Sequence, residues 1–179
     1  MKRPCIFFDR DGIVNKSPGS GYVERWEDFH LMAGFVASLK TVTVKGYPAV
    51  IITNQQGVAK ELYSEAELDG MHEKMREQLR AEGVDVLDIF KCIHFAADHC
   101  SCRKPKPGMM LDAAEKFDFD LSGSWMIGDS ETDVEAGQAA GCRTIRVCPL
   151  TEETHAEFHV AQMDDVAAIL EKELTPCES

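Results

Sequence analysis

PCIFFDRDGIVN, residues 4–15, contains a short apolar run that ends at two aspartates separated by one residue. The apolar run covers residues 5–8, and the two carboxylates belong to Asp9 and Asp11. A run of this length, rich in aromatic and β-branched residues, is typical of a buried strand. In an extended chain residues i and i+2 point the same way, so both carboxylates can reach one ligand. The stretch predicts a buried strand that delivers two carboxylates to one place.

The rest of the chain alternates short apolar runs with amphipathic segments. The expected strands are residues 5–8, 49–53, 88–94, 124–127 and 144–148. The expected helices are residues 35–45, 65–82, 108–116, 132–140 and 165–173. The clearest helix begins at a capping-box pattern, Ser64 with Glu67, and ends before Gly83. Strands that alternate with helices predict an α/β fold with a mostly parallel sheet and helices on both faces.

Composition limits the class of protein. The 179 residues fit one domain, with a core at 5–148, a C-terminal helix at about 162–174 and a short tail. A net charge of −12 disfavours a nucleic acid partner, because the phosphate backbone repels an acidic chain. We find no apolar stretch of about 18 residues, so we expect no membrane contact. The basic start runs into only four apolar residues, so we expect no signal peptide, a cytoplasmic location and, by default, a monomer.

Polar side chains follow the expected strands where each strand ends. Asp9 follows the first strand, Thr53 and Asn54 end the second, and Asp129 follows the fourth in SWMIGDSETD. Ligands of parallel α/β sheets bind at the carboxyl ends of the strands, near a switch in strand order. We therefore expect these side chains to meet in one crevice.

The aspartates predict a magnesium site in that crevice. Asp9, Asp11 and Asp129 would repel one another unless a divalent cation lay among them, and Mg²⁺ prefers hard oxygen ligands. Of two neighbouring carboxylates, one can act as a nucleophile while the other transfers protons. The alternative is that Asp11 and Gly12 form a turn after a strand. The polar residues at the other strand ends favour the magnesium site.

The segment KCIHFAADHCSCRKPKPGMM carries a second group of metal ligands. Its spacing is Cys92-x-His94-x5-Cys100-x-Cys102, and three thiolates with one imidazole can form a closed tetrahedral Zn²⁺ site. A closed site is structural, so this zinc would hold a loop in place. His99 is an alternative ligand or a neighbour of the site. The remaining alternative is a group of free cysteines near a loop. Seven cysteines in a chain without an export signal indicate a reducing compartment, and thiols this close together in such a compartment are usually metal ligands.

Positive charge follows directly after these ligands. Arg103 and Lys104 are followed by two prolines, Pro105 and Pro107, which stiffen the segment before the next helix. A zinc-anchored loop would hold both cations at the crevice and supply the positive charge that an anionic substrate needs. The alternative is a basic cluster that faces water, as charge runs usually do.

Together these motifs resemble the haloacid dehalogenase (HAD) superfamily of phosphotransferases. DRDG after the first strand, a threonine after the second, a later lysine and GDSETD after the fourth match the order of its four motifs across residues 5–148. The resemblance implies a Rossmann-like sheet with a minimal cap and an Mg²⁺-dependent aspartyl-phosphate mechanism. It also implies these roles: Asp9 as nucleophile, Asp11 as proton donor and later general base, Thr53 and Lys104 as groups that stabilise the phosphoryl, and Asp9, Asp11 and Asp129 as Mg²⁺ ligands.

The Cys/His segment resembles a small subgroup of that superfamily, which contains heptose 1,7-bisphosphate phosphatases and histidinol-phosphatases. GYVERWEDFHLMAG, TNQQGVA and LYSEAELDGMH resemble the heptose branch. This resemblance implies a phosphatase that acts on the 7-phosphate of D-glycero-D-manno-heptose 1,7-bisphosphate. The residues it implies for substrate binding are Gly19, Ser20, Gly21, Tyr22, Asn54, Gln55, Gln56 and Arg103.

Two departures from the subgroup bear on the identity of the substrate, and two alternative functions follow from the sequence. Ser130 stands where the subgroup often has a lysine, and the loop at residues 16–20, KSPGS, is longer than usual. Histidinol phosphate or another small phosphorylated metabolite is therefore an alternative substrate. A receiver-like signalling domain also has a doubly wound sheet and a phosphorylated aspartate, but places that aspartate after the third strand. Here the third expected strand leads into Cys92 and His94.

Overall fold

The computed structural model describes residues 2–177, and residues 1 and 178–179, at the two ends of the expected domain, lie outside the described residues. The strands are β1 (Ile6–Phe8), β2 (Ala49–Asn54), β3 (Asp88–Cys92), β4 (Trp125–Gly128), β5 (Arg143–Val147) and β6 (Phe158–Val160). The α-helices are α1 (Ala33–Val44), α2 (Glu65–Ala81), α3 (Gly108–Phe117), α4 (Glu131–Ala140) and α5 (Val166–Glu173). Short 3₁₀ turns lie at Trp26–Asp28, Ala96–Asp98, Leu121–Gly123 and Met163–Asp165.

One six-stranded parallel sheet forms the centre of the molecule, in the order β3-β2-β1-β4-β5-β6. The predicted α/β fold with a parallel sheet is confirmed. The expected strands are each present with ends shifted by up to two residues. The edge strand β6 was not predicted, because three half-buried residues are too short to give a periodic signal.

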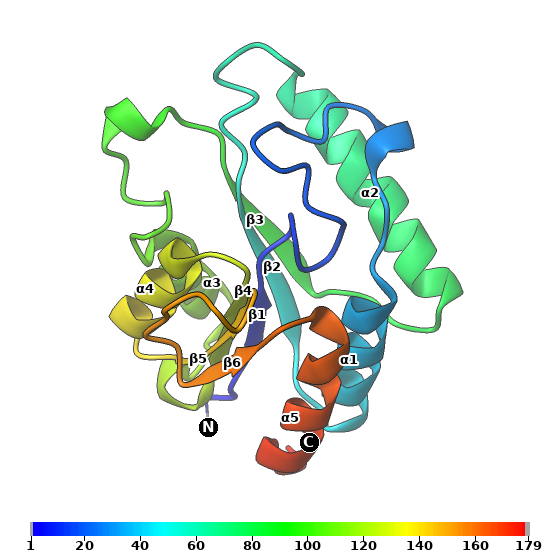
Figure 1. The fold of residues 1–179 in the computed structure, drawn as a ribbon, viewed down its shortest axis with the longest axis vertical. Coiled ribbons are helices and arrows are strands. Elements are labelled where there is room, and N and C mark those ends of the chain that lie inside the picture. The colour runs from blue at the N-terminus through cyan, green and yellow to red at the C-terminus, as the bar shows by residue number, and fades with distance from the viewer. Residues whose placement is uncertain (1, 178–179) are drawn as a thin grey trace.

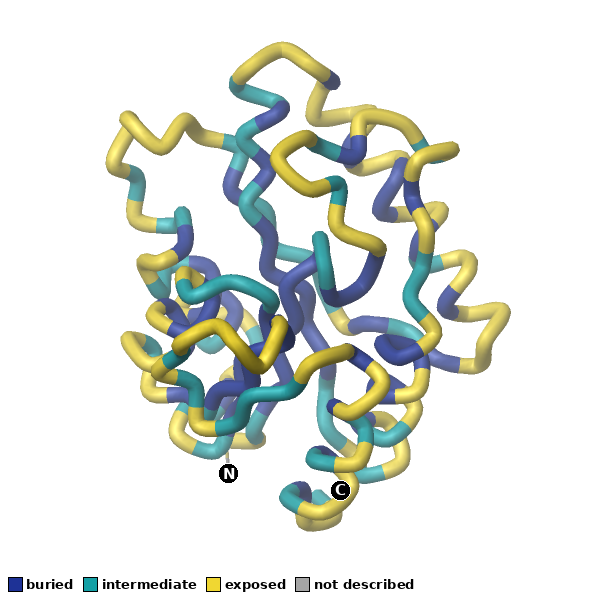
Figure 2. The backbone as a smooth tube through the Cα atoms, viewed as in Figure 1, coloured by how far each residue is buried: buried dark blue, intermediate teal, exposed yellow. Residues whose placement is uncertain are grey.

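The sheet separates two groups of helices (Figure 1), and a hydrophobic cluster fills the space on each side of it. Along β1 the side chains alternate: Phe8 meets Phe35 of α1 edge to face at 5.1 Å between ring centroids, on the side of α1, α2 and α5. Phe7 points to the other side and meets Phe119 at 6.2 Å, beside α3 and α4. Figure 2 shows the consequence, since the central strands are buried while the loops and outer turns are exposed. A strand buried on both faces explains why residues 5–8 form an unbroken apolar run.

Helix α2 begins where the capping pattern predicts. The Ser64 hydroxyl accepts a hydrogen bond from the Glu67 backbone N–H (3.2 Å), and the Glu67 carboxylate accepts one from the Ser64 N–H (2.7 Å). Leu68, Met71, Met75 and Leu79 are buried along one face and form the apolar stripe of an amphipathic helix. Among residues 2–177, none of the helices combines the length and the apolar character that crossing a bilayer requires.

The strand order places a switch point at the centre of the sheet. After β1 the chain builds β2 and β3 on one side, and then returns to build β4 and β5 on the other side of β1. The carboxyl ends of β1 and β4 therefore diverge into loops that leave a crevice between them. Asp9 directly follows β1 and Asp129 directly follows β4.

Candidate active site

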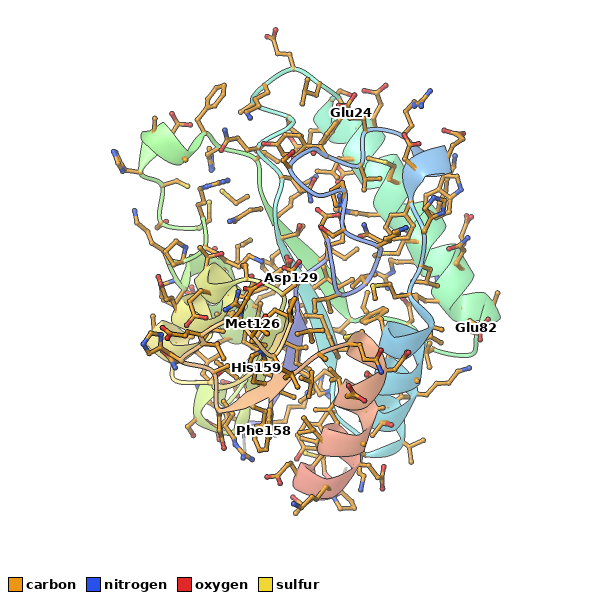
Figure 3. The ribbon with its side chains drawn as sticks, in the orientation of Figure 1. Glu24, Glu82, Met126, Asp129, Phe158 and His159 are labelled. Atoms are coloured by element: carbon orange, nitrogen blue, oxygen red, sulfur yellow. The ribbon has the colours of Figure 1, made fainter. Side chains whose placement is uncertain are left out.

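A cavity of about 250 Å³ opens at this switch point. The predicted residues that line it are Asp9, Asp11, Gly19, Gly21, Tyr22, Thr53, Asn54, Lys104 and Asp129. Ser130 lines it as well, together with Thr132 and Asp133. Asp129 lies at the centre of the molecule, at the end of β4 away from Phe158 (Figure 3). The carboxyl ends of β1, β2 and β4 do supply one site, as the sequence predicts.

Three carboxylates converge in the cavity: those of Asp9, Asp129 and Asp133 offer oxygens that all lie within 4.8 Å of one another. Gly12 makes this approach possible, because at its φ of +91° a Cβ atom would lie 2.1 Å from an Asp129 oxygen. Asp133 was not predicted, and Asp11 is not a member of this group. The signal for Asp133 was present, since GDSETD places a second aspartate one helical turn after the first.

Burial and mutual repulsion disfavour the ionised forms of these carboxyls. Burial raises the pKa of Asp9, and Asp133 and Asp129 raise it further, against the opposing charge of Lys104. Burial also raises the pKa of Asp129 to about 6, again with a contribution from Asp133. A divalent cation would remove this penalty, so the electrostatics of the residues fit a metal site.

Lys104 places a buried positive charge among these carboxylates. Its Nζ lies 2.6 Å from an oxygen of Asp9 and 2.6 Å from an oxygen of Asp133, and it donates to the Ile52 carbonyl at 3.1 Å. Burial alone would lower the pKa of Lys104, but the carboxylates of Asp133 and Asp9 raise it above its usual value. Lys104 is therefore held charged at the centre of the site.

The backbone of Lys104 is held by Asn54. The Asn54 amide donates to the Lys104 carbonyl and its oxygen accepts from the Lys104 N–H, both at 3.1 Å. Asn54 was predicted to bind substrate. Its side chain is engaged in these two bonds, which fix the loop that carries Lys104 to the end of β2.

Asp133 divides its two oxygens between α4 and Lys104. One oxygen accepts hydrogen bonds from the Ser130 N–H (3.1 Å) and the Ser130 hydroxyl (2.8 Å), at the start of the helix. The other oxygen forms the ion pair with Lys104. One Asp133 oxygen is hydrogen-bonded to Ser130, and the other faces Lys104 as an ion pair without a hydrogen bond. Asp9 and Asp129 each have a carboxylate oxygen outside these contacts, so they are the carboxylates best able to bind a cation. Mg²⁺ usually binds through one or two carboxylates and a substrate phosphate, which fits this pair.

Asp11 lies at the edge of the cavity with donors on both of its oxygens. The Arg10 guanidinium approaches at 3.0–3.1 Å through Nε and Nη2, and Asn15 donates at 2.9 Å. The Gln55 amide donates to Asp11 at 3.0 Å and to the Thr53 hydroxyl oxygen at 2.8 Å. The Thr53 hydroxyl can accept this bond and still donate its proton toward the cavity.

Four residues predicted to bind substrate lie outside the lining of this cavity: Ser20, Gln55, Gln56 and Arg103. Gln55 is fully buried, and the Gln56 side chain accepts from the Ala96 N–H at 3.2 Å. Arg103 lines a neighbouring cavity of about 220 Å³ together with Lys104. The Nη1 atom of Arg103 is buried with no hydrogen-bond partner among the described residues.

The predicted zinc ligands come together after β3. Cys92, His94, Cys100 and Cys102 have ligand atoms that all lie within 4.8 Å of one another, whereas His99 is outside the group. The Cys92 and Cys100 sulfurs are 3.6 Å apart, and the Cys102 sulfur lies 3.4 Å from that of Cys100 and 3.2 Å from His94 Nδ1. A tetrahedron with Zn–S bonds of about 2.3 Å has edges of about 3.8 Å, so the four atoms fit a zinc ion with small adjustments.

Comparison with known sequences places the chain among phosphatases. A family model described as HAD-hydrolase-like matches residues 101–171. A D-glycero-alpha-D-manno-heptose-1,7-bisphosphate 7-phosphatase from Photorhabdus laumondii is 39% identical over 147 residues, covering 78% of this chain and 79% of that protein. A D-glycero-beta-D-manno-heptose-1,7-bisphosphate 7-phosphatase from Pseudomonas putida is 34% identical over 168 residues, covering 92% and 95%.

Solved structures agree in fold. The D,D-heptose 1,7-bisphosphate phosphatase from B. bronchiseptica, complexed with magnesium and phosphate, has a TM-score of 0.87 at 32% identity and covers 97% of this chain and 99% of that one. The corresponding phosphatase from Burkholderia thailandensis has a TM-score of 0.67 at 24% identity, covers 93% and 97%, and shares the fold.

Proposed function

The chain belongs to the HAD-like hydrolases, as a phosphatase, and from this membership we propose that it removes the 7-phosphate of D-glycero-D-manno-heptose 1,7-bisphosphate. The observation that carries the proposal is the buried Lys104, held between Asp9 and Asp133 and beside Asp129 at the switch point of the sheet. Such a site concentrates one fixed cation and several carboxylates where a phosphoryl group can enter.

In the proposed reaction Asp9 attacks phosphorus and forms an aspartyl phosphate, while the bond to the sugar oxygen breaks. Asp11 donates a proton to that leaving oxygen. In the second step Asp11 takes a proton from a water molecule, whose oxygen attacks phosphorus and releases inorganic phosphate and the Asp9 carboxylate. One carboxylate thus serves as nucleophile and the other as acid and then base.

Lys104 and Thr53 are proposed to hold the phosphoryl oxygens. Lys104 is charged and already fixed by three contacts, so it needs no reorganisation when negative charge develops. The Thr53 hydroxyl accepts from Gln55, which leaves its proton for the substrate. Both groups stand at the end of β2, directly beside the nucleophile that follows β1.

Asp9 and Asp129 are proposed to hold Mg²⁺, with Asp11 as the further ligand that the motif resemblance implies. When bound, the ion would neutralise the phosphoryl oxygens and lower the barrier to attack. The raised pKa values of Asp9 and Asp129 support this assignment, because two buried carboxylates are costly without a cation.

The loop after β3 is proposed to hold a structural Zn²⁺ through Cys92, His94, Cys100 and Cys102. Arg103 follows the last ligand and is proposed to contact the substrate from the neighbouring cavity that it lines together with Lys104. The other proposed contacts are Gly19, Ser20, Gly21, Tyr22, Asn54, Gln55 and Gln56. We further propose a monomeric enzyme located in the cytoplasm.

The test is kcat/KM with Mg²⁺ on a matched panel of phosphate esters. The panel holds both anomers of heptose 1,7-bisphosphate, histidinol phosphate and several common sugar phosphates. We expect one heptose anomer to exceed every other ester by about a hundredfold, which is about 2.7 kcal/mol of differential transition-state binding. A preference for histidinol phosphate would overturn the heptose assignment. Stoichiometric phosphorylation without turnover would instead indicate the receiver-like alternative.

A further inference from the structure

Arg10 lies between the two aspartates of the first motif, yet the proposed reaction gives it no part. Its side chain is fully buried behind the cavity. Nε and Nη2 donate to the Asp11 carboxylate, and Nη1 lies 3.2 Å from Nε2 of His72 in α2. The guanidinium thus joins the proposed proton donor to a histidine on a helix that contributes nothing to the lining of the cavity.

The chemistry of this contact fixes the state of His72. An arginine side chain carries only donors and keeps its charge, so His72 Nε2 must be the acceptor. The imidazole is therefore neutral, with its proton on Nδ1. Burial, with the charges of Arg10 and Lys91 in support, lowers the pKa of His72 to about 3, so it stays neutral across the working range of pH.

Both ends of the planar guanidinium are then occupied. Asp11 holds the edge formed by Nε and Nη2, and His72 holds Nη1. Without His72 the guanidinium could rotate about its long side chain, and the Asp11 carboxylate would rotate with it. Asn15 and Gln55 hold Asp11 by one bond each, while Arg10 approaches both of its oxygens.

We propose that His72 is a positioning residue that acts through Arg10 to orient the Asp11 carboxylate toward the leaving oxygen of the substrate. The inference rests on the proposed role of Asp11 in proton transfer. It assigns to α2, on the side of the sheet away from the zinc loop, an indirect influence on the chemical step, transmitted by Arg10.

The test uses the dependence of the rate on the leaving group. A sugar hydroxyl is a poor leaving group and needs the proton from Asp11, whereas 4-nitrophenolate leaves without one. If His72 acts through Asp11, its loss must lower kcat/KM more for the sugar phosphate than for 4-nitrophenyl phosphate. A loss of packing would lower both values by the same factor.

His72→Leu replaces the imidazole by an apolar side chain of similar size and removes the hydrogen-bond acceptor. We expect it to lower kcat/KM about tenfold to a hundredfold for the heptose bisphosphate and less than about threefold for 4-nitrophenyl phosphate, with KM little changed. His72→Gln, whose amide oxygen can stand in for Nε2, should recover activity to within about threefold of the parent enzyme. If His72→Leu does not fold, the test uses His72→Asn instead. The asparagine side chain is too short for its amide oxygen to reach Arg10.

Two controls separate the possible results. Met75→Ala removes a buried side chain one turn further along α2 and should lower Tm while leaving the ratio between the two substrates unchanged. Asp11→Asn should lower kcat/KM, which reports transfer of the phosphoryl group to Asp9 and not the later hydrolysis shared by both esters, far more for the heptose bisphosphate than for the aryl ester. Equal losses on both substrates in His72→Leu, with the expected pattern in Asp11→Asn, would overturn the role of His72 alone. Equal losses in Asp11→Asn would overturn the proposed role of Asp11, and the His72 inference with it.

Discussion

The carboxylate site and the Cys/His loop lie next to each other but are built in different ways. Asp9 and Asp129 directly follow β1 and β4, two paired strands at the centre of a buried sheet. The Cys/His loop, residues 92–104, leaves the edge strand β3. Its one regular element is the 3₁₀ turn Ala96–Asp98, and none of the three residues of that turn is buried. The sheet positions the first region, whereas we expect the second to depend on a metal ion held by its four ligands. Lys104 belongs to the loop by sequence and to the carboxylate site by position.

The largest effect should come from the region that the sheet positions. Asp9→Asn removes the proposed nucleophile but keeps the size of the side chain, so we expect turnover to fall by about 10⁴-fold or more. Fold and zinc content should not change, because the zinc ligands lie elsewhere. The measurement is kcat on the heptose bisphosphate, with Asp112→Asn, an exposed carboxylate on α3, as the matched control. Near-normal turnover in Asp9→Asn would show that another group attacks phosphorus.

The next effect tests whether the loop depends on metal. Cys100→Ser removes one of the four ligands, so we expect zinc content to fall from about one per chain toward zero. Activity should fall about tenfold to a hundredfold, because Lys104 then keeps its contacts with Asn54, the Ile52 carbonyl and the carboxylates but loses the anchored loop that precedes it. Metal analysis and kcat/KM measure the two changes together.

Cys148→Ser is the control for Cys100→Ser, since this buried cysteine lies outside the four-ligand group. It should keep both zinc and activity. Absence of zinc from the parent protein, even after reconstitution, would show that the loop is held by its protein contacts alone.

A smaller effect should follow from Asn54, which joins the two regions. Asn54→Ala removes two hydrogen bonds to the Lys104 backbone, so we expect kcat/KM to fall about threefold to tenfold. The double variant with Cys100→Ser should lose more than the two single effects predict together, because each anchor compensates for loss of the other. Additive losses would show that zinc and Asn54 hold Lys104 independently.

Site residues whose place is set by a strand could be predicted from the sequence better than site residues whose place is set by a distant side chain. Asp9 and Asp129 were predictable because each directly follows a buried run, and parallel strands end at one edge. Asp133 was not predicted, because an acidic residue in the first turn of a helix is normally explained by capping. It does cap α4 through Ser130, and its second oxygen reaches Lys104 only in the folded chain.

The predicted substrate residues at the end of β2 show the same limit. Asn54 and Gln55 are adjacent to Thr53, and sequence alone gives no reason to separate them from it. In the fold, Gln55 turns inward because the Tyr63 hydroxyl donates to its oxygen at 2.7 Å, and Asn54 binds the Lys104 backbone. Tyr63 is eight residues away and Lys104 fifty, so local patterns do not contain these contacts.

The smallest predicted effect is on folding stability, through its dependence on pH and on Mg²⁺. The pKa of Asp129 is raised to about 6 in the folded protein and that of Asp9 is raised as well, whereas both are near 4 in an unfolded chain. Between these values the folded state binds more protons, so the stability of the metal-free protein falls as pH rises from about 4 through 6 and above. Mg²⁺ binds the ionised carboxylates and should offset this loss.

We therefore expect the rise in Tm on adding Mg²⁺ to be about 3 °C larger at pH 8 than at pH 5, measured by calorimetry. Comparing samples with and without Mg²⁺ at each pH cancels the titration of surface groups. Asp129→Asn, which cannot ionise, should remove most of the difference, while Asp112→Asn should retain it. An equal Mg²⁺ effect at both pH values would mean that Asp9 and Asp129 are already ionised at pH 5 without a cation, so that the protein around them, and not Mg²⁺, offsets the burial of their charges.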